Sequence, residues 1–293
     1  MIYALIDQWQ QKASVAQACR VLSVSRSGYY AARLRAKTPA ICADTTHLKA
    51  AFAASGRSYG SRRLVSALQG RQIVIGRYKV RRLMREANLK PVWKRKFVST
   101  TDSKHNLPVA ENILNRQFNP AMPNQAWTSD ITYIRTRTGW LYLAVVMDLC
   151  SRKIIGWAMS PAMPAELVCR ALQMAIGHRQ PAAGLILHSD RGSQYASLEY
   201  QALLKQHGII CSMSRKGNCW DNAVMERFFL NLKMERVWQR DYANQLEASK
   251  DITNYIVGFY NCVRLHSTLG NLPPMIYEKG IAAKKPIVVP EIT

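Results

Sequence analysis

The sequence predicts an α/β protein in which a mixed five-stranded sheet with flanking helices follows an all-helical, strongly basic N-terminal region. Three observations carry this prediction. Residues 1–120 hold 22 Lys and Arg against 5 Asp and Glu, whereas residues 121–293 hold 19 against 13, so most of the net charge of +23 lies early in the chain. The apolar residues follow a helical period first and a strand period from residue 125. Three strand-like runs then precede alternating helices and strands, which is typical of a mixed sheet covered by helices.

The first 40 residues are expected to be a helix-turn-helix DNA-binding segment. Residues 15–22 and 26–35 read as two short helices around a turn, with Ser25 as the N-cap of the second. Such a pattern offers its second helix to a groove of DNA, so Arg26 and Arg33 are expected to bind DNA. A helical hairpin without a ligand is the alternative.

A basic helical DNA-binding domain is expected over residues 41–96, with breaks near 56–60 and 70–76. Its last piece, residues 77–96, carries nine Lys and Arg against one Glu. Like charges at this density repel one another, and DNA phosphates would relieve the repulsion. A solvated helix face is the alternative. The residues expected to bind DNA here are Arg77, Lys79, Arg81, Arg82, Arg85, Lys94, Arg95 and Lys96.

The rest of the chain divides into three parts. Residues 97–124 are rich in Ser, Thr, Asn and Pro and are expected to be a linker. Residues 125–240 are expected to form the sheet domain, and residues 241–293 a C-terminal helix at 245–269 followed by an extended tail with four prolines. Strands are predicted at 126–134, 140–148, 153–159, 185–190 and 209–213, and helices at 165–178, at 198–207 and from 221 onward.

Three acidic residues in the sheet domain lie in settings that suit metal ligands. Asp130 lies inside the apolar run 126–134, Asp190 ends the run 185–190, and Glu226 follows on a helix-like segment after 35 intervening residues. A buried carboxylate is costly unless something pairs with it, and converging carboxylates repel by roughly 4 kcal/mol per close pair at an effective dielectric constant near 20. A divalent cation with a preference for hard oxygen ligands, such as magnesium, would remove that penalty.

The periodicity of these segments adds further residues to the candidate site. Strand alternation places Asp130 on a polar face together with Thr128. The helical period groups Asn222, Glu226 and Lys233 on one face, away from an apolar stripe. An ordinary amphipathic helix with a solvated Glu and Lys is the alternative, and helix capping is the alternative role for Asn222.

The motifs around these acids resemble the catalytic signature of DDE transposases with a retroviral-integrase-like core. More closely, the chain resembles the OrfB-type transposases of the bacterial insertion sequences in the family numbered three. The resemblance covers almost the whole chain and includes the spacing of 35 and the basic Lys233, seven positions after the glutamate. It implies a ribonuclease H-like fold for residues 125–240. The motifs that carry it are residues 127–133, 188–195, 221–229 and 259–269.

This resemblance implies metal-dependent cleavage of DNA 3′ ends and strand transfer at the ends of an insertion sequence. Asp130, Asp190 and Glu226 would be the catalytic and metal-binding residues, holding two Mg²⁺ ions for which Mn²⁺ can substitute. Lys233 would contact the DNA phosphate next to the cut, and Asn222 would bond DNA or a ligand.

The resemblance also implies partners. These are double-stranded DNA of the terminal repeats and of the target, and further copies of the chain on that DNA. The active enzyme of the family is usually a fusion with an upstream frame, so an OrfA-type protein, separate or fused, is a further expected partner. We expect this chain to be the downstream product.

Other functions remain open at this point. A metal-dependent nuclease of the same fold would cut without joining, and a non-catalytic regulator of the same element would bind DNA without chemistry. A tyrosine recombinase needs His-x-x-Arg, whereas here the order is Arg264-x-His266; these two residues meet phosphate or pair locally. His188 is expected to be a core group and Asp148 to belong to a turn or an ion pair.

Composition excludes several other classes. No apolar run approaches the length of a membrane span. The seven cysteines are scattered without a Cys-x-x-Cys pair, which argues against a disulfide framework or a zinc site. The cysteine usage fits a reducing cytosol, and the resemblance implies a cytoplasmic bacterial protein at the nucleoid.

Overall fold

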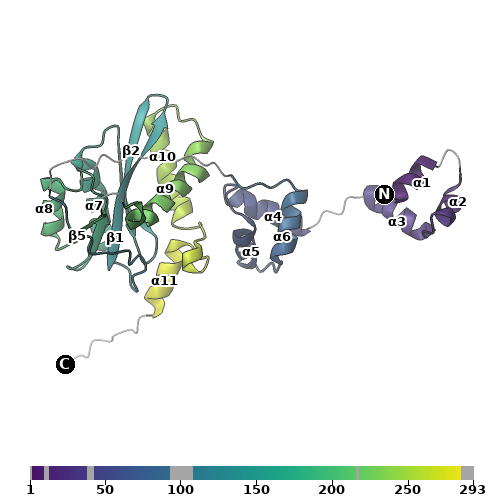
Figure 1. The fold of residues 1–293 in the computed structure, drawn as a ribbon, viewed down its shortest axis with the longest axis horizontal. Helices are drawn as coiled ribbons and strands as arrows, with labels where there is room; N and C mark the ends of the chain where they lie inside the picture. Colours follow the sequence, from purple (N-terminus) through teal and green to yellow (C-terminus); the bar gives the residue numbers. More distant parts are fainter. Residues whose placement is uncertain (1, 10–12, 38–42, 93–107, 216–217, 285–293) are drawn as a thin grey trace.

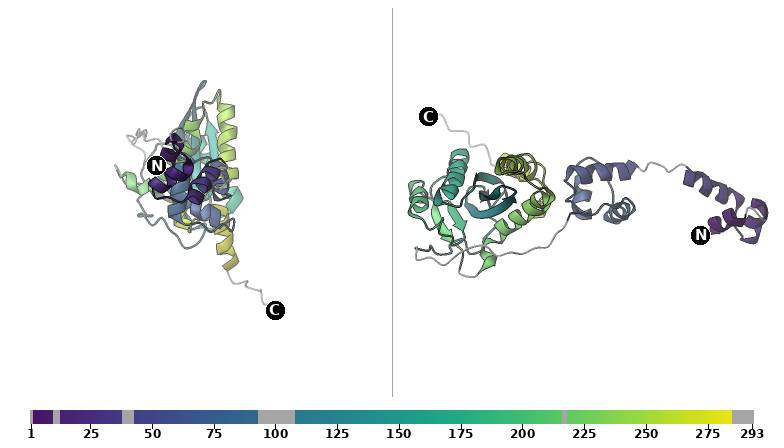
Figure 2. Two further views of the ribbon diagram at one scale, coloured as in Figure 1. Left: turned by 90° about the vertical axis from the view of Figure 1, so that its right-hand side faces the viewer. Right: turned by 90° about the horizontal axis from the view of Figure 1, so that it is seen from above.

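A five-stranded mixed sheet forms the core of the C-terminal part, at the left of Figure 1 and of the right-hand view in Figure 2, as the sequence predicted. The computed structural model describes residues 2–9, 13–37, 43–92, 108–215 and 218–284. The strand order is β3-β2-β1-β4-β5. β1 pairs antiparallel with β2 and parallel with β4, and β5 extends the parallel part. The strands are β1 (Ala126–Thr136), β2 (Gly139–Asp148), β3 (Ile154–Ser160), β4 (Ile186–Ser189) and β5 (Ile210–Met213).

Helices bury both faces of this sheet. One core contains α7 (Ala165–Arg179) and α8 (Leu198–Gln206). The other contains α9 (Ala223–Glu235) and α10 (Gln245–Asn254) with the π-helical turn η3 (Tyr255–Tyr260). Successive residues of β2 alternate between the two cores, which explains why this strand is a nearly continuous apolar run. Two short 3₁₀ turns, η1 (Cys219–Asn222) and η2 (Val237–Gln239), flank α9.

The first helices pack around a small core of their own. α2 (Val15–Val21) and α3 (Arg26–Lys37) match the predicted pair, and the Ser25 hydroxyl accepts from the Gly28 amide, as expected of an N-cap. An additional helix, α1 (Ile2–Trp9), was not predicted; its Ile6 is fully buried against the other two.

A second helical unit contains α4 (Ala43–Ala54), α5 (Ser61–Gln69) and α6 (Arg77–Glu86), separated by the predicted breaks and packed around one apolar core. Within the basic piece 77–96, α6 ends at Glu86, and residues 87–92 are not helical. Asn88 adopts a positive φ of 51°, and the Leu89 amide donates back to the Met84 carbonyl, which closes the helix. Lys94, Arg95 and Lys96 lie outside the described residues.

The C-terminal part also differs from the prediction. Helical structure from Gln245 ends at Tyr260, and only a short 3₁₀ turn, η4 (Ser267–Leu269), follows. The tail is not extended as far as the structure describes it, because α11 (Pro274–Lys284) is a helix. Proline is favourable at the first helical position, where its missing N–H costs nothing. Glu278 then fixes α11 to the sheet domain through Arg179 and Lys153.

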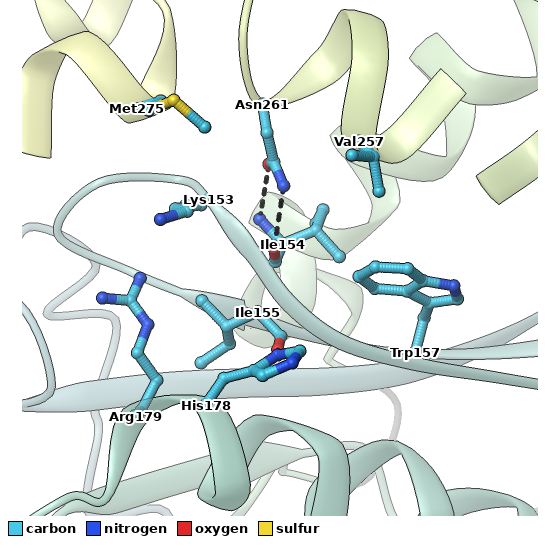
Figure 3. Close-up of a pocket in the computed structure, with 9 residues that line it drawn as sticks. All are labelled: Lys153, Ile154, Ile155, Trp157, His178, Arg179, Val257, Asn261 and Met275. Atoms are coloured by element: carbon cyan, nitrogen blue, oxygen red, sulfur yellow. Dashed lines mark hydrogen bonds between the residues drawn. The ribbon is translucent and has the colours of Figure 1, made fainter. Parts of the chain in front are cut away.

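Edge strand β3 is covered by this C-terminal part. The Asn261 side chain accepts from the Ile154 amide and donates to the Ile154 carbonyl, at 2.9 Å each (Figure 3). A cavity of about 400 Å³ lies beside this contact, between β3, α7, η3 and α11 (Figure 3). None of the predicted catalytic residues lines it. Asn261 therefore forms hydrogen bonds with backbone groups that an open sheet edge would leave unpaired.

The expected linker is only partly described. Its second half, residues 108–124, lies on the sheet domain: Leu114 is buried, and its amide donates to the Ser212 hydroxyl. No helix in the described part of the chain combines the length and apolarity that crossing a bilayer requires.

The packing of β3 against α7 predicts a strong effect of one methyl group. A Cβ on Gly156 would lie 2.2 Å from the Ala171 carbonyl oxygen, so Gly156→Ala should lower the free energy of unfolding by roughly 1–3 kcal/mol or more. Gly177 lies on α7, as Ala171 does, and a Cβ there would have no neighbouring atom within 4 Å. Gly177→Ala should therefore raise the free energy of unfolding by up to about 1 kcal/mol. Urea denaturation measures both; equal stability of Gly156→Ala and the parent would contradict the packing.

Candidate active site

The sheet topology brings the three predicted acids to one place. Asp130 lies on the central strand β1, and Asp190 follows β4, the parallel neighbour of β1. Glu226 lies in the first turn of α9, which packs against β1. Burial raises the pKa of Asp130 well above its usual value, and the charges of Asp190 and then of Glu226 raise it further. The charges of Asp190 and Glu226 therefore act on Asp130.

Hydrogen bonds orient the Asp130 carboxylate from two sides. Its Oδ1 accepts from the Ile131 amide and its Oδ2 from the Asn222 side-chain nitrogen, both at 2.7 Å. The Asn222 oxygen in turn accepts from the Thr128 hydroxyl at 3.3 Å. This amide thus joins the start of α9 to the polar face of β1. It makes no capping hydrogen bond, although Asn222 occupies the N-cap position.

The other two acids have different surroundings. Asp190 accepts from the Gly192 amide at 2.9 Å, in the turn after β4. Glu226 is exposed, whereas Asp130 and Asp190 are half-buried; desolvation raises the pKa of Glu226. Among the described residues, no three His, Cys, Asp or Glu side chains have the arrangement of a metal-binding cluster.

Lys233 belongs to the same site. It is half-buried, and its Nζ lies 4.5 Å from the centroid of the Tyr133 ring. Burial lowers the pKa of Lys233, and the charge of Asp130 opposes this effect. The aromatic face and the carboxylate both favour the charged ammonium at this position.

An ion cluster around the buried Asp221 fixes the segment in front of Asn222. Asp221 has no exposed side-chain surface and accepts from Arg116, Arg215 and Asn112, each at about 2.9 Å. The hydrogen bond from Arg215 is the largest effect that lowers the pKa of Asp221. The cluster ties residues 112–116 to the beginning of α9. The sequence analysis missed it, because nothing in the sequence pairs positions about 100 residues apart.

Three further residues considered in the sequence analysis make contacts within the protein. His188 is buried between the hydroxyls of Ser212 and Ser214, and burial lowers the pKa of His188 to about 4. Asp148 belongs to a turn and accepts from the backbone amides that follow β2. Arg264 is buried and pairs with Glu235.

The basic residues expected to bind DNA lie on two helices. On α3, Arg26 is exposed, and Arg33 lies 6.0 Å from the Tyr29 ring centroid and 3.9 Å from an oxygen of Asp7. On α6, the exposed basic residues are Arg77, Lys79, Arg81, Arg82 and Arg85, with Lys79 paired to Asp44.

Comparisons with known proteins agree with this architecture. Models of an integrase core domain match residues 120–219 and 207–274, and an HTH-like domain model matches residues 42–97. The matched HTH-like part is therefore the second helical unit; the helix-turn-helix interpretation of residues 1–40 stays a prediction.

Relatives of similar length cover almost the whole chain. The 31 kDa protein of insertion element IS600 from Shigella sonnei is 44% identical over 264 residues, which make up 89% of this chain and 97% of that protein. The transposase InsF of insertion sequence IS3A from Escherichia coli (strain K12) is 41% identical over 283 residues, 95% of this chain and 98% of that protein. The HTLV-2 integrase catalytic core domain in complex with magnesium covers 54% of this chain and 98% of its own, at 17% identity and a TM-score of 0.43.

The electrostatics of the site predict a stability gain from removing one charge. Without divalent metal, Asp130→Asn should raise the free energy of unfolding at pH 7, because burial and like charges disfavour the ionised Asp130 in the folded protein. A carboxyl with a raised pKa contributes stability that is present below its unfolded pKa of about 3.9 and lost as the pH rises through the folded value. The gain in the free energy of unfolding caused by Asp130→Asn should therefore shrink as the pH is lowered toward 4.

Urea denaturation in EDTA at several pH values measures this gain. Asp148→Asn is the matched control. The oxygens of the Asp148 carboxylate accept from three backbone amides, so replacing the carboxylate by an amide should lower the free energy of unfolding. No gain for Asp130→Asn at pH 7 would contradict the charge repulsion described for the site.

Proposed function

The chain belongs to the IS3-family transposases of the InsF type, and we propose that Asp130, Asp190 and Glu226 form the site where it cuts and joins DNA. The family confirms the expected resemblance and the class of enzyme, a DDE transposase with an integrase core. The observation that supports the location is that the charges of Asp190 and Glu226 act on Asp130, which lies on the central strand β1.

The chemistry of the site suits divalent cations. Its donors are carboxylate oxygens, which magnesium prefers, and burial together with the charges of Asp190 and Glu226 raises the pKa of Asp130. Asp130, Asp190 and Glu226 would hold two magnesium ions, with manganese as a substitute. When bound, such a pair stabilises the attacking and leaving oxygens of an in-line phosphoryl displacement.

The protein's own residues supply orientation. Asn222 and the Ile131 amide hold the Asp130 carboxylate, and the Gly192 amide holds that of Asp190. Lys233 places a positive charge beside Asp130, where a DNA phosphate next to the cut would bind. Water attacks the phosphodiester at the element end in the first reaction, releasing a 3′ hydroxyl. That hydroxyl attacks a second phosphodiester in the next, so no covalent protein–DNA link forms.

The HTH-like unit α4–α6 is proposed to bind the terminal repeats. Tyr78 on α6 is 86% exposed among the arginines, which gives this helix a basic surface with an aromatic group available to bases. Arginines of this helix would reach phosphates or guanine edges. The helices α2 and α3 and the residues at 94–96 are further proposed DNA contacts.

We further propose that the chain works as a homo-oligomer on DNA, at the nucleoid in the bacterial cytoplasm, with an OrfA-type protein as partner or fusion. Helix α1 supports a protein partner: Ile2, Leu5 and Trp9 follow a helical period and are each at least 40% exposed. An apolar helix face of this kind is typical of an interaction surface.

Amide substitution of each acid tests the site. Asp130→Asn, Asp190→Asn and Glu226→Gln should each lower cleavage of a terminal-repeat DNA in magnesium by roughly 10²-fold or more, because each removes a charged ligand. Asp241→Asn is the control, since this exposed carboxylate pairs only with Arg137 among the ion pairs of the described residues. A gel assay on labelled DNA measures cutting, and pre-cut ends measure joining. Full activity in any acid variant contradicts the assignment; cutting without joining indicates a nuclease.

Alanine substitution on α6 tests DNA binding by the HTH-like unit. Arg81→Ala and Arg85→Ala should each weaken binding of terminal-repeat DNA by roughly tenfold, and a lost phosphate contact should reduce the salt slope by about one. Arg137→Ala, an exposed arginine of the sheet domain, should leave affinity unchanged. Fluorescence anisotropy over a salt series measures these effects. Unaltered binding by both α6 variants would assign recognition to another part of the chain.

A further inference from the structure

A single tyrosine joins the HTH-like unit to the sheet domain. Tyr59, between α4 and α5, is 3% exposed. Its hydroxyl accepts from the Leu265 amide at 2.7 Å and lies 3.4 Å from the Val263 carbonyl oxygen, to which it donates. Leu265 also packs against the apolar core of α4–α6. The segment 263–265, which follows η3, is therefore held from the side of the DNA-binding unit.

Arg264, between Val263 and Leu265, contacts the last residue of α9. Arg264 is 1% exposed, and its guanidinium donates to Glu235 at 2.8 and 2.9 Å. Glu235 is the last residue of α9 and also accepts from the Tyr255 hydroxyl at 2.6 Å. Because α9 carries Glu226 in its first turn, a continuous set of contacts runs from Tyr59 to the helix of the active site.

The surroundings make this junction rigid. A buried ion pair is stable only when further hydrogen bonds satisfy both partners, which fixes their geometry. The Arg264 guanidinium lies 5.8 Å from the Tyr260 ring centroid, and Arg63 of α5 lies 5.7 Å from that of Tyr59. His266 is buried beside Arg264, and burial and nearby arginines lower the pKa of His266, so it adds no charge here.

Contacts such as that of Tyr59 place the HTH-like unit, and the DNA that it is proposed to bind, relative to the active site.

We propose that Tyr59 is a positioning residue, which fixes the HTH-like unit against the end of α9 and so sets the distance between the bound DNA sequence and the bond that is cut. The inference rests on the proposed functions of α6 and of the three acids. Tyr59 itself does not touch the reacting atoms.

Tyr59→Phe tests this role, because it removes the hydroxyl and keeps the ring. The affinity of Tyr59→Phe for DNA should stay at the parental value. Cutting at the element end should fall by about tenfold, which is the effect of losing one to two hydrogen bonds. Cuts at neighbouring phosphodiesters should increase. Tyr242→Phe is the matched control, since it removes another buried hydroxyl, bonded to Asp251 at 2.8 Å inside the sheet domain. It should leave the cut position unchanged.

A distance measurement tests the same role without activity. Spin labels carried by non-canonical amino acids at Gln69 of α5 and Gln206 of α8 should give a narrow distance distribution in the parent and Tyr242→Phe, and a broad one in Tyr59→Phe. Equal widths of the distance distributions of Tyr59→Phe and the parent overturn the inference. So does cutting by Tyr59→Phe at the parental rate and position, or an equal increase of cuts at neighbouring phosphodiesters in Tyr242→Phe. A parent that cuts no DNA overturns the proposed function instead, and the label distances still decide the role of Tyr59.

Discussion

The central constraint of this structure is an ionisable group on the middle strand of a sheet that is covered on both faces. Asp130 pairs with Val145 of β2 and lies two residues beyond the part of β1 that pairs with β4, and burial disfavours its charge. Hydrogen bonds from Ile131 and Asn222 offset part of that cost. Natural folds keep such unfavourable groups at functional sites and offset them elsewhere. Here the ten-residue pairing of β1 with β2 and the buried apolar faces of β2 supply the stability that Asp130 costs.

Helix α9 is the second element on which the site depends, and both of its ends are anchored by buried ions. Before its first turn, Asp221 is held by Arg116 and Arg215; at its last residue, Glu235 is held by Arg264. Its apolar side chains, including Phe228 and Leu232, fill the core between these ends. The helix therefore cannot rotate without breaking one of the two clusters, which fixes the positions of Glu226 and Lys233 relative to β1.

The parts of this arrangement that sequence analysis could predict depend on local patterns. Period and turn residues gave the five strands and most helices, and apolar context singled out the three acids. Contacts such as Asn222 with Asp130 join positions 92 residues apart, and no periodicity reveals them. The errors have local causes as well. Asn88 follows the end of α6 in a left-handed conformation that its side chain tolerates, and Pro274, one of the prolines taken as signs of an extended tail, starts α11 instead. The HTH-like match covers residues 42–97, which include α4–α6.

The uneven charge of the chain follows from the chemistry of the site. A phosphodiester that approaches Asp130 meets carboxylates of its own sign, so the site by itself disfavours its substrate. Lys233 supplies one positive charge nearby, and cations would supply more, but the attraction that holds DNA has to come largely from elsewhere. The residues up to 120 carry a net +17. Binding energy gained on that surface can hold a reactive phosphate against local repulsion only if the two parts keep a fixed distance. The proposed junction of Tyr59 between the HTH-like unit and α9 would keep that distance fixed.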